Sequence, residues 1–209
     1  NPLASTAEVE FELFGLDGLR VASPANPVRY RVESDSALSM DVDTIFAVSG
    51  AVGWIRVSSD RSSLAARLQT GDFASTLEEV SPGVPLVDQL VVIPAGDPLA
   101  IPVLRVVNPS DSFTAVNVTV FDSQGNVAER LPAALEAFAG IEFTLSAPSG
   151  SAARISSSQA VLAQVEVRTG DTLLLINGQA VSGPNAAFRV APHAVIGNGF
   201  ESTLILSNP

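Results

Sequence analysis

Few residues in this 209-residue chain have types and spacings that could do chemistry, and the first candidate is the only histidine, His193. It lies in the stretch APHAVIGNG, directly after Pro192 and beside no acidic residue. A catalytic triad could draw its partners from distant parts of the sequence, but the chain has no G-x-S-x-G nucleophile motif. Without cysteine it also has no thiolate metal site and no cysteine nucleophile. We therefore interpret His193 as a loop residue and expect no enzymatic activity.

The acidic stretch ESDSALSMDVD is a candidate cation site. Asp41 and Asp43, two positions apart on an extended segment, would point the same way, and Glu33 or Asp35 could complete the ligands of a calcium ion. The spacing lacks the D-x-[DN]-x-[DN]-G order of a calcium loop. The sequence therefore predicts a solvated acidic loop, with calcium as the alternative and no other cofactor.

Three glutamates at positions 8, 10 and 12 form a second acidic group, because they alternate with Val9, Phe11 and Leu13 in EVEFELF. Paired carboxylates can hydrolyse glycosides, but that chemistry needs a sugar-binding cleft and two different carboxylate environments. Identical neighbours on one exposed strand face suit protection of a sheet edge better. We therefore predict a structural role for the row.

This alternation belongs to an internal repeat that organises the chain. Residues 1–18 align without a gap with residues 108–125, and six positions are identical. The second copy keeps the alternation in AVNVTVF, and each copy then reaches a glycine, Gly18 or Gly125, of the kind that hairpins need for a positive φ. Period two predicts a half-buried strand that runs into a hairpin in each copy.

Further matches extend the repeat to the C-terminus. VRYRV (28–32) matches IEFTL (141–145), and WIRVSSDRSSLAARLQTGD matches ARISSSQAVLAQVEVRTGD. We predict strands there, one more strand or hairpin in the insertion DSALSMDVDTIFAVS, and a loop or single turn in RLPAALEAFAG. The predicted fold class is all-β, with two tandem antiparallel β-sandwich domains at residues 1–93 and 94–193. Residues 194–209 are predicted to be the first strand of a further or neighbouring domain.

The dipeptide Asn-Pro closes LRVVNP in the middle of the chain and LILSNP at its end, and it also opens the sequence. Proline gives no N–H to a sheet and disfavours helix before it, so both phrases are typical of strands stopped by a turn. If each domain begins with such a strand, the N-terminal domain lacks its first strand and the C-terminus carries a spare one. An unpaired edge and an open core are unfavourable in water.

We expect this gap to be filled by a preceding repeat of a longer polypeptide, by a neighbouring molecule, or by the same chain folding back. The first two sources give a head-to-tail polymer, because a heterologous contact that does not close propagates. The donor strand would comprise Leu204, Ile205, Leu206, Asn208 and Pro209. The acceptor core would include Val9, Phe11 and Leu13.

The combination of LRVVNPSDSFTAVNVTVFDSQGNV with the later GWIRVSSD resembles immunoglobulin-like or fibronectin-III-like β-sandwich repeats, found in tandem on large secreted or surface bacterial proteins. The resemblance covers nearly the whole chain and implies an extracellular or cell-surface location in a bacterium. It implies no catalytic residue. The chain departs from immunoglobulin domains because it lacks the cysteine pair, and Trp54 does not fall at the usual core tryptophan position.

The amino-acid composition limits which classes of partner the chain could bind. The net charge of −11, with every positive charge an arginine, leaves no basic patch for nucleic acid and disfavours anionic membrane surfaces. No apolar run is long enough for a spanning helix, so we expect no direct membrane insertion. We predict a structural repeat of an extracellular fibre, filament or stalk. The alternative is a surface adhesin or carbohydrate-binding module, with glycans as ligands, although Trp54 and Tyr30 are few aromatics for such a platform.

Overall fold

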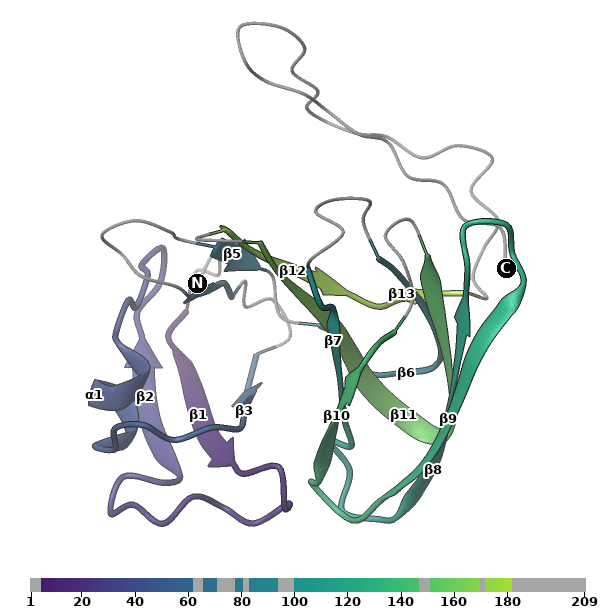
Figure 1. Ribbon diagram of the computed structural model, residues 1–209. Coiled ribbons are helices and arrows are strands. Elements are labelled where there is room, and N and C mark those ends of the chain that lie inside the picture. The colour runs from purple at the N-terminus through teal and green to yellow at the C-terminus, as the bar shows by residue number, and fades with distance from the viewer. Residues whose placement is uncertain are drawn as a thin grey trace, which may run out of the picture.

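A computed structural model describes residues 5–61, 66–70, 78–80, 83–93, 100–146, 151–169 and 172–181. Its strands pair antiparallel in a three-stranded, an eight-stranded and a two-stranded sheet (Figure 1). The chain is therefore mostly β, as its alternating segments predict. The elements in chain order are β1 (Ala7–Phe14), β2 (Val28–Val32), α1 (Val42–Phe46), β3 (Trp54–Ser59), β4 (Leu68–Thr70), β5 (Glu78–Val80), β6 (Leu86–Val92), β7 (Val103–Val107), β8 (Thr114–Phe121), β9 (Val127–Leu135), β10 (Gly140–Thr144), β11 (Ala152–Thr169), β12 (Thr172–Asn177) and β13 (Gln179–Ala180).

The three-stranded sheet, here called the N-terminal sheet, has the order β2-β1-β3. The odd-numbered side chains of β1 form its apolar face, and α1 contributes Ile45 and Phe46 to the cluster around Leu13. The prediction of a further strand or hairpin in the insertion is therefore wrong, because residues 35–49 contain the five-residue helix α1 and no strand. A sheet with one apolar face needs cover, and two adjacent bulky residues on a short helix supply it.

The eight-stranded sheet, here called the C-terminal sheet, is organised around the 18-residue strand β11. The first part of β11 pairs with β6 and β8, and its last part pairs with β7 and β12 (Figure 1). Strands β9, β10 and β13 extend the sheet from β8, β7 and β6. One large apolar cluster lies among these strands and includes Val118, Ile155 and Leu104. β6, which precedes residue 93, thus pairs within the C-terminal sheet.

Strand β9 corrects a second prediction, because RLPAALEAFAG is not a loop or single turn over its first part. Residues up to Leu135 form β9, and Pro132 lies opposite Asn117 of β8. Within the described residues β9 pairs with β8 alone. Proline is tolerated on such an edge strand because its missing N–H need not serve a second neighbour.

The two copies of the repeat share one strand register. Six pairs between β1 and β3, from Phe14 with Trp54 to Val9 with Ser59, correspond to six pairs between β8 and β11, from Phe121 with Ala152 to Val116 with Ser157. Adding 107 to each β1 number and 98 to each β3 number converts one set into the other. The same relation gives both hairpins, since the pair of Phe14 with Arg20 becomes that of Phe121 with Val127.

Strand β2 has a different counterpart from the one that the sequence match predicts. β1 pairs with β2 from Ala7 opposite Val32 to Phe11 opposite Val28. β8 pairs in the same way with β9, from Thr114 opposite Leu135 to Val118 opposite Leu131. Residues 28–32 therefore correspond to 131–135 of β9, and their match with 141–145 is wrong. Residues 28–32 and 141–145 both alternate between apolar and polar side chains, and this alternation alone does not determine which neighbouring strand each one pairs with.

Candidate assembly interface

The structure places some of the predicted site residues and not others. His193 and the predicted donor strand residues, Leu204 to Leu206 with Asn208 and Pro209, lie outside the described residues. Asp41 is the N-cap of α1 and Asp43 lies in its first turn, where Asp43 Oδ1 accepts a hydrogen bond from the N–H of Thr44 at 2.8 Å. The two carboxylates are thus not neighbours on an extended segment. Across the described ranges, no three His, Asp or Glu side chains gather as a metal site.

The glutamate row has three different environments, so its members are not the identical neighbours that the sequence predicts. Glu8 is exposed, Glu10 is half-buried and pairs with Arg29, and Glu12 is 1% exposed. The hydrogen bond to Glu10 raises the pKa of Arg29. β1 is also the central strand of its sheet, so protection of an edge is not the reason for the row. A shallow hollow of about 310 Å³ lies beside Glu8, Glu10, Arg29 and Asp60.

The predicted acceptor core is partly covered within the N-terminal sheet. Val9 packs with Ala7 and Val32, and Leu13 packs with Ile45 and Phe46. Phe11 is only half-buried and meets the ring of Tyr30 edge-on at 6.0 Å. The open part of this core lies on β3 instead, where Val57 is 44% exposed although its counterpart Ile155 is fully buried.

A stack of aromatic rings joins the two sheets, and we call it the aromatic junction: Phe14, Trp54, Phe138 and the guanidinium of Arg56. The Phe14 ring is stacked on Trp54 and on Phe138, with 4.9 Å between ring centroids in each pair. Arg56 lies 5.0 Å from the Phe138 centroid and 5.5 Å from that of Phe14. Trp54 Nε1 donates a 2.9 Å hydrogen bond to the carbonyl of Phe138. Such stacking and cation–π contacts are favourable beyond the apolar area they bury.

Phe138 reaches the junction because it lies in a turn between β9 and β10, here called the junction turn (136–139). Its φ of 60° is a left-handed conformation that costs a bulky residue energy. The turn is held by hydrogen bonds from the N–H of Ala139 to Glu136 O at 3.1 Å and from the N–H of Phe138 to Ser110 O at 3.0 Å. These contacts and the ring stack compensate for the strained backbone.

Asn108, the asparagine of the central Asn-Pro pair, anchors the junction turn. Its fully buried side-chain amide donates to the carbonyls of Ser112 at 2.7 Å and Glu136 at 2.8 Å, and its Oδ1 accepts from the N–H of Ser110 at 3.1 Å. The role of this pair is not set by proline alone. The asparagine itself binds the turn to the end of β7, because a buried amide must have partners for its donors and acceptor.

The hairpin after β1 (Gly15–Leu19) receives the junction turn through a close backbone approach. A Cβ at Gly18, where φ is 83°, would lie 2.4 Å from the carbonyl oxygen of Ala137. The N–H of Gly140 donates a 2.9 Å hydrogen bond to the carbonyl of Leu16. Gly18 is therefore required both by its positive φ and by the proximity of the other sheet.

In each sheet, ion pairs form between residues that alternate along the strands with the core residues. Glu12 is bonded to Arg20 and Arg56, so the buried carboxylate and the junction guanidinium hold each other in place. On the C-terminal sheet Arg154, the counterpart of Arg56, donates to both carboxylate oxygens of Asp88, at 2.9 and 2.7 Å. These hydrogen bonds hold the pKa of Asp88 below its usual range.

Sequence reasoning missed Phe138, Asn108 and the Glu12 pairs as parts of an interface. Asn-Pro was the available signal for Asn108, and the identical position of Phe14 and Phe121 was the signal for the stack. Phe138 gave no signal, because its partner Phe14 is 124 positions away and in a different sheet. The described part of the chain has no helix long and apolar enough to cross a bilayer.

No family model and no curated protein matches the chain. A solved structure described as "Crystal Structure of Thermotoga maritima 1070" is 14% identical, with a TM-score of 0.38. The match covers 49% of this chain and 98% of the other.

Proposed function

We propose that this chain is a structural repeat unit of an extracellular fibre, filament or stalk, built from two tandem β-sandwich repeats that assemble head to tail by strand complementation. One observation supports the proposal: the same strand framework has more paired neighbours and a more completely buried core in the C-terminal sheet than in the N-terminal sheet. β11 has neighbours on both sides, whereas in the described residues its counterpart β3 pairs with β1 alone. The exposure of Val57 against the burial of Ile155 is the consequence for the core.

The proposed donor strand is the C-terminal segment Leu204 to Leu206 of a neighbouring molecule. Its counterparts in β7 are Leu104 to Val106, and the side chains of Leu104 and Val106 are fully buried in the C-terminal core. The same apolar pattern would supply a core strand to the N-terminal sheet, whose acceptor side chains include Phe11 beside Val9 and Leu13. Strand addition provides main-chain hydrogen bonds, and the alternating side chains provide specificity.

The test is the association state of the full chain, which is measured by sedimentation velocity and negative-stain electron microscopy. Concentration-dependent linear polymers are the expected result. The double variant Leu204→Asp/Leu206→Asp should remain monomeric, because it places charge where apolar side chains must be buried. The matched control Thr203→Asp/Ser207→Asp carries the same charge on the other face of the segment and should polymerise.

A second readout locates the accepted strand. β7, the counterpart of the donor strand, pairs with Leu162 to Glu166 of β11, which correspond to Leu64 to Leu68. Amide hydrogen exchange at the backbone of Leu64 to Leu68 should therefore slow on association, because these residues gain hydrogen-bond partners. Compact monomers at all concentrations would overturn the proposed function. Polymers that form equally well from the Leu204→Asp/Leu206→Asp variant would overturn strand complementation as the mechanism.

A further inference from the structure

Each sheet carries a hairpin and a turn that correspond, by strand register, to the two halves of the aromatic junction. Within the described residues the chain brings together one of the two possible combinations, the hairpin of the N-terminal sheet and the turn of the C-terminal sheet. The hairpin after β8 (Asp122–Asn126) repeats the hairpin that receives the junction turn. The hydrogen bonds from the N–H of Gly15 to Leu19 O and from the N–H of Gly18 to Gly15 O recur at the corresponding positions in the C-terminal sheet. Gly125 has a φ of 85°, against 83° at Gly18.

A turn equivalent to the junction turn follows β2 in the N-terminal sheet, and we call it the N-terminal turn (33–36). Adding 103 to its residue numbers gives 136–139, by the same relation that superimposes β2 on β9. The N–H of Ser36 donates to Glu33 O, as the N–H of Ala139 donates to Glu136 O. Asp35 has a φ of 53°, close to the 60° of its counterpart Phe138.

The face that corresponds to the receiving side of the junction lies on the C-terminal sheet, and we call it the matching face: Phe121, Gly125, Val127, Ala152 and Arg154. Val127 is 46% exposed. Among the described residues, nothing lies within 4 Å of a Cβ built at Gly125, whereas the same atom at Gly18 would strike the junction turn. The matching face thus has the backbone shape of a junction without the turn that fills it.

The residues that would meet in the second combination carry opposite charges. Phe138 lies 5.0 Å from the guanidinium of Arg56. In the second combination an exposed aspartate, Asp35, replaces Phe138, and Arg154 replaces Arg56. Arg154 is bonded to Asp88 as Arg56 is bonded to Glu12, so in the second combination a carboxylate would face the guanidinium in place of the ring. Aspartate also tolerates the left-handed conformation better than phenylalanine does.

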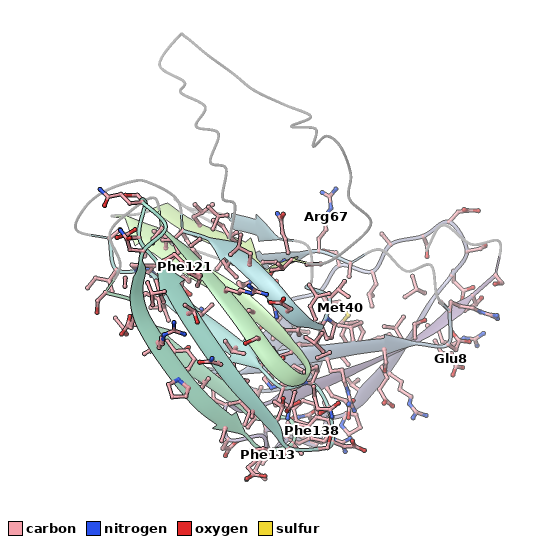
Figure 2. The ribbon with its side chains drawn as sticks, turned by 90° about the vertical axis from the view of Figure 1, so that its right-hand side faces the viewer. Glu8, Met40, Arg67, Phe113, Phe121 and Phe138 are labelled. Atoms are coloured by element: carbon pink, nitrogen blue, oxygen red, sulfur yellow. The ribbon has the colours of Figure 1, made fainter. Side chains whose placement is uncertain are left out.

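We propose that the matching face of one molecule docks the N-terminal turn of a second copy of this chain, with Asp35 against Arg154. This inference rests on the proposed head-to-tail assembly and names its contact surface. Phe121 and Phe138 lie at opposite ends of the C-terminal sheet, and Phe121 and Glu8 lie on opposite sides of the molecule (Figure 2). Thr6 Oγ1 binds Glu33 at 2.8 Å, so the N-terminal turn lies at the Glu8 end of β1. The contact is therefore heterologous and extends a polymer.

The absence of native cysteine allows a direct test with single-cysteine variants of the full chain. Ser34→Cys and Gln124→Cys, mixed and treated with a short bismaleimide, should give an intermolecular crosslink. The control is the mixture of Thr44→Cys, on α1, with Gln124→Cys, and it should give little crosslinked product. Asp17→Cys/Ala137→Cys in one molecule places thiols at the corresponding positions of the first junction, and should crosslink within the chain.

Charge provides the second test. Asp35→Asn removes the carboxylate and keeps a residue suited to a positive φ, and it should weaken self-association about two- to fivefold. Asp41→Asn makes the same change at an exposed helix N-cap and should leave association unchanged. Polymers without the selective crosslink, or equal effects of the two variants, would overturn the contact and leave the proposed function standing. A chain that stays monomeric would overturn both.

Discussion

Replacing Phe138 by alanine tests whether the aromatic junction couples the two sheets. The substitution removes a half-buried ring, its stack on Phe14 at 4.9 Å and its contact with Arg56 at 5.0 Å. About 1 kcal/mol for the buried area, about 0.5–1.5 for the stack and about 0.5–1 for the cation–π contact give an expected loss of about 2–3.5 kcal/mol. The free energy of unfolding should fall by that amount.

The backbone of Phe138 adds an internal check. Because its φ is 60°, alanine at this position stays strained, whereas glycine does not. Phe138→Gly should therefore be about 1 kcal/mol more stable than Phe138→Ala, although glycine removes more of the side chain. In most other contexts glycine would be the less stable of the two.

Urea unfolding followed by tryptophan fluorescence measures both effects at the junction, since Trp54 is the only tryptophan and is stacked on Phe14. Circular dichroism on the same samples gives the change for the whole chain. Phe113→Ala is the matched control, because Phe113 is 52% exposed, and it should change the free energy of unfolding by less than about 0.5 kcal/mol. An unchanged urea midpoint for Phe138→Ala would refute the coupling.

Three further changes probe the same framework. Gly18→Ala should cost at least about 1 kcal/mol more than Gly125→Ala in urea unfolding, because both strain a positive φ but only the first strikes the junction turn; equal costs would contradict that contact. Asn108→Ala should cost about 2–4 kcal/mol by thermal unfolding, since it leaves several buried groups unpaired, and a loss under 1 kcal/mol would argue against the anchor. Arg154 lowers the pKa of Asp88 in the folded protein. The ion pair therefore contributes to the free energy of unfolding above the unfolded pKa of about 4, and this contribution is lost as the pH falls through the lower pKa of the folded state. Asp88→Asn should therefore flatten the acid side of the stability profile in urea titrations between pH 5 and 2, and an unchanged slope would show that another carboxylate dominates.

The alternation in EVEFELF and AVNVTVF was enough to predict β1, β8 and their hairpins, because a half-buried strand must place every second side chain on the core. The six identical positions between 1–18 and 108–125 also indicated one framework in two copies. The register of β1 with β3 and of β8 with β11 agrees with that alignment pair for pair.

Predictions failed where neighbours decide the conformation. The insertion around Asp41 to Phe46 forms α1, because the N-terminal sheet needs cover over Leu13. β9 accepts Pro132 because only one of its edges is paired among the described strands. The glutamate row has a gradient of burial because one end of β1 lies against Arg20 and Arg56 and the other is exposed.

Local preferences can be read from the amino-acid sequence alone: which segments alternate, where glycine permits a turn, and that the strand phrases recur. The meeting of Phe14, Trp54 and Phe138, and the presence of the receiving face and the turn in two copies, are visible in the folded protein alone. The two kinds of information differ in the range of the interactions behind them. Alternation and turn chemistry act over a few residues, whereas the junction depends on how two sheets far apart in the chain are oriented against each other.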